Sequence, residues 1–153
     1  MSRIESRLAS LGIELPEVCP PVANYVSSTR SDNVVQISGQ LSTHTGGGIK
    51  GTVGADCSLA DGIIAARLCA INLVAQFKAA ADGDLDRIAR VLRLGGYVQA
   101  GPEFFDIPTV MNGCSDLIVD VFGEAGKHAR SAIGVYRLPF NFAVEVDAVV
   151  ELA

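Results

Sequence analysis

The chain has 153 residues, of which 49% are hydrophobic and 19% charged, and its net charge is −5. This length suits one domain, residues 1–153, with a sizeable core. The twelve Lys and Arg are scattered, which argues against nucleic acid as a partner. No apolar run reaches the roughly 18–20 residues of a membrane helix, and the N-terminus does not resemble a signal peptide. We therefore expect a cytoplasmic protein without a membrane partner.

The first 21 residues form an extension that precedes the main pattern. Ile4, Leu8 and Leu11 recur at helical spacing, and Gly12 follows as a stop signal. Residues 13–26 contain three prolines, which should keep this lead-in extended or irregular.

Residues 33–41, "NVVQISGQL", are rich in β-branched side chains and predict a strand, with a bulge or a close backbone approach at Gly39. The glycine-rich segment 42–55 predicts a flexible loop. A long helix then begins after Ser58, an N-cap with Asp61 placed as in a capping box, and runs to about Ala81. Its expected apolar face comprises Ile64, Leu68, Ile71, Ala75 and Ala79.

The second half of the chain alternates strands with one more helix. Residues 86–100 predict a strand, and Pro108 suits the first turn of a helix that Gly123 ends. Residues 129–138 and 142–152 predict two strands joined through "PFN" as in a hairpin. This order indicates an α+β fold, with both main helices on one face of the sheet. A partner subunit would cover the other face and account for the high apolar content.

Arg130 is the most informative residue, because a permanent charge on an apolar strand needs an anion nearby. Glu145 and Asp147 lie two positions apart on the last strand and so share one face. Two interpretations follow: a salt bridge from Arg130 to one of these carboxylates, or an arginine kept free for a ligand carboxylate. A partly buried carboxylate could also orient a water.

Other polar residues give weaker signals. Ser38 and Gly39 could face a ligand or form an ordinary bulge, and Asn112 could bind a ligand or cap a turn. His44 and His128 are interpreted as surface residues. The four cysteines have neither CxxC nor metal-ligand spacing, so we expect free thiols, no metal and no cofactor.

Taken together, "NYV", "ISGQ", "VMNG" and "ARSAIGVYRLP…VEVDAVV" resemble the Rid family (RidA/YjgF), the imine deaminases, over about residues 22–152. The resemblance implies a chorismate-mutase-like homotrimer with sites between subunits. Such proteins hydrolyse 2-imino acids to 2-keto acids and ammonia. A chain of this kind without activity would instead be a small-carboxylate binder or regulator. The ribonuclease label of some relatives fits poorly with the acidic composition.

By this resemblance Arg130 grips the substrate carboxylate and Glu145 positions the attacking water. Tyr25, Ser38, Gly39 and Asn112 would line the pocket, together with Ala132, which stands where many of the deaminases have cysteine. Further departures from the family pattern are "KHAR" before the arginine motif, the long loop 42–55 and the N-terminal extension.

Overall fold

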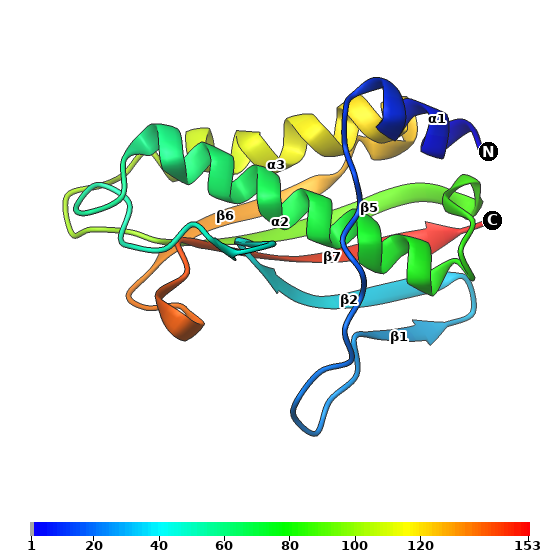
Figure 1. The fold of residues 1–153 in the computed structure, drawn as a ribbon, viewed down its shortest axis with the longest axis horizontal. Coiled ribbons are helices and arrows are strands. Elements are labelled where there is room, and N and C mark those ends of the chain that lie inside the picture. The colour runs from blue at the N-terminus through cyan, green and yellow to red at the C-terminus, as the bar shows by residue number, and fades with distance from the viewer. Residues whose placement is uncertain (1) are drawn as a thin grey trace.

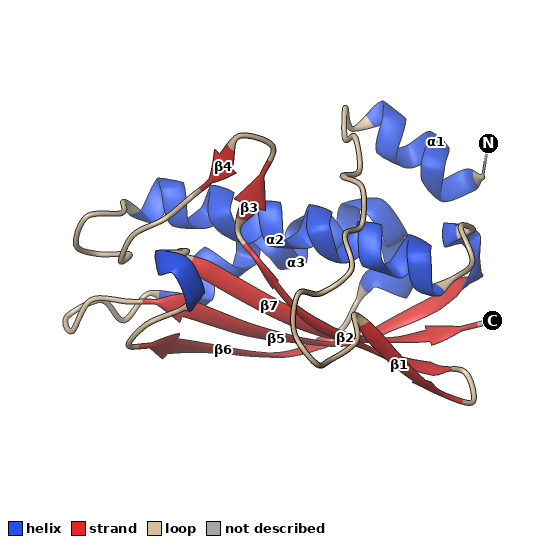
Figure 2. Ribbon diagram, turned by 60° about the horizontal axis from the view of Figure 1, so that its bottom comes forward, coloured by secondary structure: helices blue, strands red, loops and turns tan. Residues whose placement is uncertain are grey.

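The computed structural model describes residues 2–153, so that Met1 of the predicted extension lies outside it. A five-stranded mixed sheet forms one layer, and the helices form a second layer on one of its faces (Figure 2). In sequence order the strands are β1 (Ser28–Ser31), β2 (Val34–Leu41), β5 (Ile88–Gln99), β6 (Ala129–Val135) and β7 (Val144–Leu152). Their spatial order is β1-β2-β7-β5-β6. The α+β architecture predicted from the sequence is confirmed, although the polar edge strand β1 of this sheet was not anticipated.

Three α-helices accompany the sheet: α1 (Arg3–Ser10), α2 (Leu59–Ala80) and α3 (Ile107–Phe122). Helices α2 and α3 lie side by side over the same face, as expected (Figures 1 and 2). Short 3-10 helices span Leu85–Arg87, Gly123–Gly126 and Pro139–Asn141. Part of the predicted flexible loop forms a small hairpin, β3 (Thr43–His44) with β4 (Gly47–Gly48).

The prediction that β6 and β7 form a hairpin is wrong. Strand β5 lies between them, and Leu94 of β5 pairs with Arg130 on one side and with Ala148 on the other. Strand β6 is parallel to β5, because α3 carries the chain back across the sheet. The "PFN" segment is therefore one part of a longer connection that passes the end of β5.

The helix ends follow local chemistry. The Ser58 hydroxyl accepts a hydrogen bond from the Asp61 backbone N–H at 3.1 Å and so caps α2. Pro108 lies in the first turn of α3, and Gly123 closes that helix with a φ of +62°. The N-terminus of α1 meets the Asp86 carboxylate, which accepts from the backbone N–H groups of Arg3 and Ile4 at 2.8 and 2.9 Å.

The predicted apolar face of α2 is only partly correct. Ala75 is buried, but Ile64 is 49% exposed and Ala79 is also exposed. The side chains that face the sheet and α3 belong to the adjacent stripe, which includes Ala65, Ala66, Cys69, Ala70, Leu73, Val74 and Phe77. Because α2 is apolar on nearly every side, its periodicity could not decide which side faces inward.

Helices α2 and α3 approach closely at Gly113. A Cβ at this position would lie 2.2 Å from the Ile63 carbonyl oxygen of α2, so only glycine permits this spacing. The close contact fixes the height of α3 above the sheet. It thereby also fixes where the side chains of α3 meet the edge strand β6.

Candidate functional site

Arg130 points from the edge strand β6 toward α3, on the helix-covered side of the sheet. Its Nη1 donates to the Asn112 side-chain oxygen at 3.0 Å and to the Ser115 hydroxyl at 3.1 Å. Its Nη2 donates to the Pro108 carbonyl oxygen at 3.3 Å. The three acceptors lie on successive turns of α3 and form a stripe along one side of the helix.

The first of the two interpretations of Arg130, a salt bridge to Glu145 or Asp147, is wrong for residues 2–153. The ion pairs of residues 2–153 join Lys78 to Glu5, Arg87 to Asp82 and Lys127 to Glu124. This salt bridge cannot form because β5 separates the strand of Arg130 from that of the carboxylates.

Two donors of the Arg130 guanidinium remain available. A guanidinium has five N–H groups, and the three hydrogen bonds occupy both hydrogens of Nη1 and one of Nη2. Within residues 2–153 the Nε–H and the second Nη2 hydrogen have no partner. These neighbouring donors match the spacing of the two oxygens of a carboxylate.

Asn112, a predicted site residue, thus contacts Arg130 directly. Ala132 lies two positions beyond Arg130 on β6, on the same side of the strand, and packs against the core. Ser115, which the sequence did not single out, is a further member of this group. We call Arg130, Asn112, Ser115 and Ala132 the arginine half-site.

Glu145 belongs to a second group on the opposite face of the sheet. Its neighbours Val144 and Val146 are buried beneath the helices, so the alternation of β7 turns Glu145 to the uncovered face. Gly39 lies at the β2 bulge, and a Cβ there would come within 2.4 Å of Glu145 Oε1. Both predicted properties of Gly39, the bulge and the close approach, are confirmed.

Ser38 and Tyr25 lie beside Gly39. The Ser38 hydroxyl donates to the Val26 carbonyl oxygen at 2.7 Å and ties the N-terminal lead-in to β2. Tyr25 is 57% exposed. Tyr25, Ser38 and Gly39 help to line a shallow hollow of about 220 Å³. We call Tyr25, Ser38, Gly39 and Glu145 the glutamate half-site.

The Glu145 carboxylate is half-buried, and within residues 2–153 it takes part in no hydrogen bond. Burial, together with the nearby Asp147 carboxylate, raises its pKa above the usual range for glutamate. A raised pKa and open acceptor sites suit a carboxylate that takes a proton from a bound water.

Asp147 continues the polar group on the uncovered face. It accepts a hydrogen bond from the Tyr97 hydroxyl at 3.2 Å, and its charge is the main cause of a raised Tyr97 pKa. Gly95 makes room for Asp147, since a Cβ there would lie 2.5 Å from Asp147 Oδ1. Tyr97 carries no functional signal in the sequence, because a tyrosine on a strand is most often a packing residue.

Within one chain the two half-sites cannot act on one small molecule. The arginine half-site lies on the helix-covered side at the β6 edge, whereas Glu145 lies on the uncovered face of β7, two strands away. Adjacent strands are about 4.8 Å apart, and the sheet itself stands between the two groups. The fold thus brings the predicted residues into two groups rather than one.

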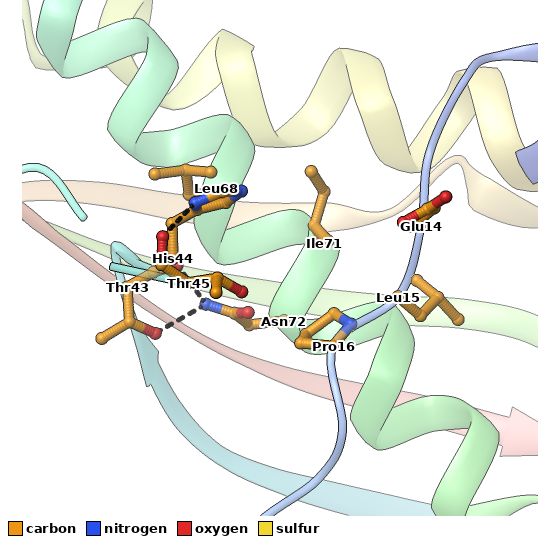
Figure 3. Close-up of a pocket in the computed structure, with 9 residues that line it drawn as sticks. All are labelled: Glu14, Leu15, Pro16, Thr43, His44, Thr45, Leu68, Ile71 and Asn72. Atoms are coloured by element: carbon orange, nitrogen blue, oxygen red, sulfur yellow. Dashed lines mark hydrogen bonds between the residues drawn. The ribbon is translucent and has the colours of Figure 1, made fainter. Parts of the chain in front are cut away.

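Another hollow, of about 270 Å³, lies where the N-terminal lead-in crosses α2 (Figure 3). Figure 3 shows the side chain of Ile71 between this segment and the hairpin residues, while Leu68 lies at the end of the hollow where His44 is drawn. The Asn72 side-chain amide donates to the Thr43 carbonyl and hydroxyl oxygens at 3.1 and 3.0 Å and holds the hairpin in place. This hollow contains none of the predicted site residues.

The four cysteines are free thiols, as expected. Cys69 and Cys114 are buried, and desolvation raises the pKa of both thiols, that of Cys114 to about 12. Neither is suited to act as a nucleophile. Among residues 2–153, no three His, Cys, Asp or Glu side chains are grouped so as to hold a metal ion.

Helix α2 is long and apolar enough to cross a membrane by length and composition, which differs from the expectation drawn from the apolar runs. Half of its apolar window is buried inside the protein. Core helices commonly have this property, so the composition of α2 is weak evidence for a membrane.

Comparison with known proteins gives a consistent family. Residues 5–152 match the family model described as "YjgF/chorismate_mutase-like, putative endoribonuclease". "Protein TCP17" of Trypanosoma cruzi is 48% identical over 152 residues, which are 98% of this chain and 94% of that protein.

Two solved structures are similar over nearly the whole chain. The protein Atu1372 of Agrobacterium tumefaciens, whose function is given as unknown, has 48% identity and a TM-score of 0.92, covering 98% of this chain and 92% of that one. A protein of Shewanella oneidensis described as a "putative endoribonuclease" has 35% identity and a TM-score of 0.94, covering 99% and 100%. The chain therefore belongs to the YjgF/Rid family, as the resemblance in its sequence indicated.

Proposed function

We propose that this protein hydrolyses small 2-imino acids to 2-keto acids and ammonia, in clefts between the subunits of a homotrimer. The observation that carries the proposal is the state of Arg130. Three neutral acceptors hold its guanidinium, no carboxylate of the described residues neutralises it, and two adjacent N–H groups remain for a ligand. A permanent charge held in this way favours a small acid.

The separation of the two half-sites supports an inter-subunit site. If the arginine half-site of one subunit faces the glutamate half-site of its neighbour, the substrate carboxylate binds to Arg130 and the imine carbon lies near Glu145. Symmetric assembly repeats this arrangement once per subunit. It also covers the sheet face that carries Glu145 and Asp147.

The chemistry then requires little beyond orientation. A protonated imine carbon is electrophilic, and a water held by Glu145 adds its oxygen to that carbon while Glu145 takes one proton. In the resulting carbinolamine the nitrogen gains a proton and leaves as ammonia, and the hydroxyl loses its proton to give the keto acid. Fixing the carboxylate at Arg130 contributes through proximity and orientation.

A carboxylate-binding or regulatory protein without catalysis is the second candidate. One observation favours it: the arginine half-site is complete within a single chain, and a small acid could bind there without Glu145. The two candidates differ in whether binding leads to turnover.

The test is to generate 2-imino acids in situ with an amino-acid oxidase and to follow semicarbazone formation. The wild-type protein should slow semicarbazone accumulation, because it hydrolyses the imine first. Arg130→Ala should lower kcat/KM at least about 100-fold, since a charged hydrogen bond contributes about 1.5–3 kcal/mol and two are lost. Arg130→Lys should lose part of the activity, because a point charge replaces the fork.

A wild-type protein that binds 2-ketobutyrate in calorimetry but leaves semicarbazone formation unchanged would favour the binder. If both Arg130 variants keep wild-type turnover, the role given to Arg130 is wrong.

A further inference from the structure

His128 lies next to the arginine half-site and has no part in the chemistry described above. It precedes β6 by one residue, and its ring is half-buried. Its Nδ1 lies 2.6 Å from the Gly126 carbonyl oxygen, and its Nε2 lies 2.9 Å from the Ser115 hydroxyl oxygen. Both ring nitrogens are therefore engaged, which is unlike the surface histidine that the sequence suggested.

The partners determine which nitrogen carries the proton. A carbonyl oxygen can only accept, so Nδ1 must donate to Gly126. In the neutral ring Nε2 is then an acceptor, and the Ser115 hydroxyl must be its donor. The lone pairs of the Ser115 oxygen are left to receive Arg130 Nη1 at 3.1 Å.

The hydrogen bonds consequently run in one direction. Arg130 donates to Ser115, Ser115 donates to His128, and His128 donates to the Gly126 carbonyl. Without His128 the Ser115 hydroxyl could rotate, and its lone pairs would no longer be fixed toward the guanidinium.

The far end of this chain of hydrogen bonds is also fixed to α3. Gly126 is buried, and a Cβ at this position would lie 2.6 Å from the Ile118 carbonyl oxygen. The carbonyl that orients His128 is thereby held against the same helix that carries Ser115. His128 is therefore connected to α3 in two ways, through the Ser115 hydroxyl and through the Gly126 backbone, and neither connection involves a long, flexible side chain.

We propose that His128 is a positioning residue that, acting through Ser115, sets the orientation of the Arg130 guanidinium and thus the affinity of the site for a small carboxylate. This inference rests on the carboxylate grip of Arg130 in the proposed function, but not on turnover. His128 itself does not contact the substrate.

The test measures binding of unreactive 2-ketobutyrate by calorimetry, alongside turnover of the imino acid. His128→Ala should raise the Kd and the KM by about two- to tenfold, the range for one lost hydrogen bond, with kcat nearly unchanged. His128→Gln should restore much of the affinity, because its amide oxygen can accept from Ser115. A merely structural role would instead reduce the active fraction, and would lower kcat with KM unchanged.

Three further variants distinguish an effect transmitted through Ser115 from a general loss of structure. His128→Ala combined with Ser115→Ala should bind no more weakly than Ser115→Ala alone, since both act through one hydrogen bond to Arg130. His44, on the exposed β3–β4 hairpin, is the matched control, and His44→Ala should leave Kd and KM unchanged.

The tautomer provides an independent readout in the unliganded protein. Nitrogen NMR of the two histidines, assigned with the His44→Ala variant, should place the His128 proton on Nδ1. An Nε2-protonated neutral ring, or a Kd for 2-ketobutyrate unaffected by His128→Ala, overturns the positioning role. Absence of turnover with these binding effects intact would refute only the deaminase proposal.

Discussion

Arg130 is held by three hydrogen-bond acceptors from one helix, whereas Glu145 accepts no hydrogen bond from the described residues and is confined by a glycine and a second carboxylate. The first arrangement fixes the direction of a charge that never titrates. The second leaves a titratable group partly desolvated, with its proton affinity raised. The proposed function assigns the two half-sites different tasks accordingly, since it has the arginine half-site bind the substrate and the glutamate half-site take part in the reaction.

Among these variants, Glu145→Gln should have the largest effect, because it affects the glutamate half-site and leaves the arginine half-site intact. The substitution keeps the shape of the side chain and removes the proton acceptor, so kcat should fall by about 100- to 10,000-fold, the usual range for a general base. The Kd for 2-ketobutyrate, measured by calorimetry, should stay close to that of the wild type. A large loss of binding with kcat retained would reverse the roles of the two half-sites.

Gly39→Ala moves the same carboxylate without changing its chemistry. The new Cβ would overlap Glu145 Oε1, so the side chain must shift. We expect kcat to fall about tenfold, the order of effect that a misplaced reacting group produces, while the Kd for 2-ketobutyrate is unchanged. Steady-state kinetics and calorimetry on one preparation check both quantities.

Asp147→Asn tests how far the charge of Asp147 contributes to the raised pKa of Glu145. Because Glu145 has a raised pKa, the carboxylate needed for catalysis is present above that pKa, and kcat should decline as the pH falls through it. Removing the Asp147 charge lowers the pKa of Glu145, so the midpoint of the kcat profile should move to lower pH. Arg130→Lys is the comparison variant, and its midpoint should not move.

Glu145 also has a predictable effect on stability. A carboxyl group whose pKa is raised by folding favours the native state below its unfolded pKa, and this contribution is lost as the pH rises through the folded pKa. Glu145→Gln should therefore raise Tm at neutral pH, and the gain should vanish in acid. Thermal unfolding at two pH values measures this directly.

The smallest expected effect on the site comes from Asp86, which is remote from both half-sites. Its hydrogen bonds to the backbone of Arg3 and Ile4 lower its pKa, so its contribution to stability is present at neutral pH and lost in acid as the pH falls through that pKa. Asp86→Asn should loosen α1, seen as faster amide exchange there, and leave kcat and KM unchanged. A change in KM would link α1 to the site.

The sequence predicted where helices and strands begin and end more accurately than it predicted which strands pair with each other. Ser58, Pro108 and Gly123 define helix ends through local hydrogen bonds and backbone geometry, and the structure places the ends there. Strand periodicity, in contrast, determines which face a residue occupies but not which strand lies alongside. This is why Glu145 and Asp147 were correctly predicted to share one face of the strand, while β6 was paired with the wrong strand.

Only those residues of the candidate site that belong to a local sequence motif could be predicted from the sequence. The motif around Arg130 indicated its importance, but Ser115 and His128 could not be connected to it from spacing alone. Their contact depends on how close α3 lies to β6, which Gly113 and Gly126 determine through backbone approaches. Such approaches leave no periodic signal in a sequence.

The most direct test of the central claim is complementation between two inactive chains. Arg130→Ala and Glu145→Gln chains, co-expressed with different tags and purified as mixed trimers, should regain about a third of wild-type turnover, because one of the three interfaces in each mixed trimer joins an intact Arg130 to a neighbour's intact Glu145. Activity no greater than the sum of the two parent variants, in assemblies verified as mixed, would contradict a site shared between subunits.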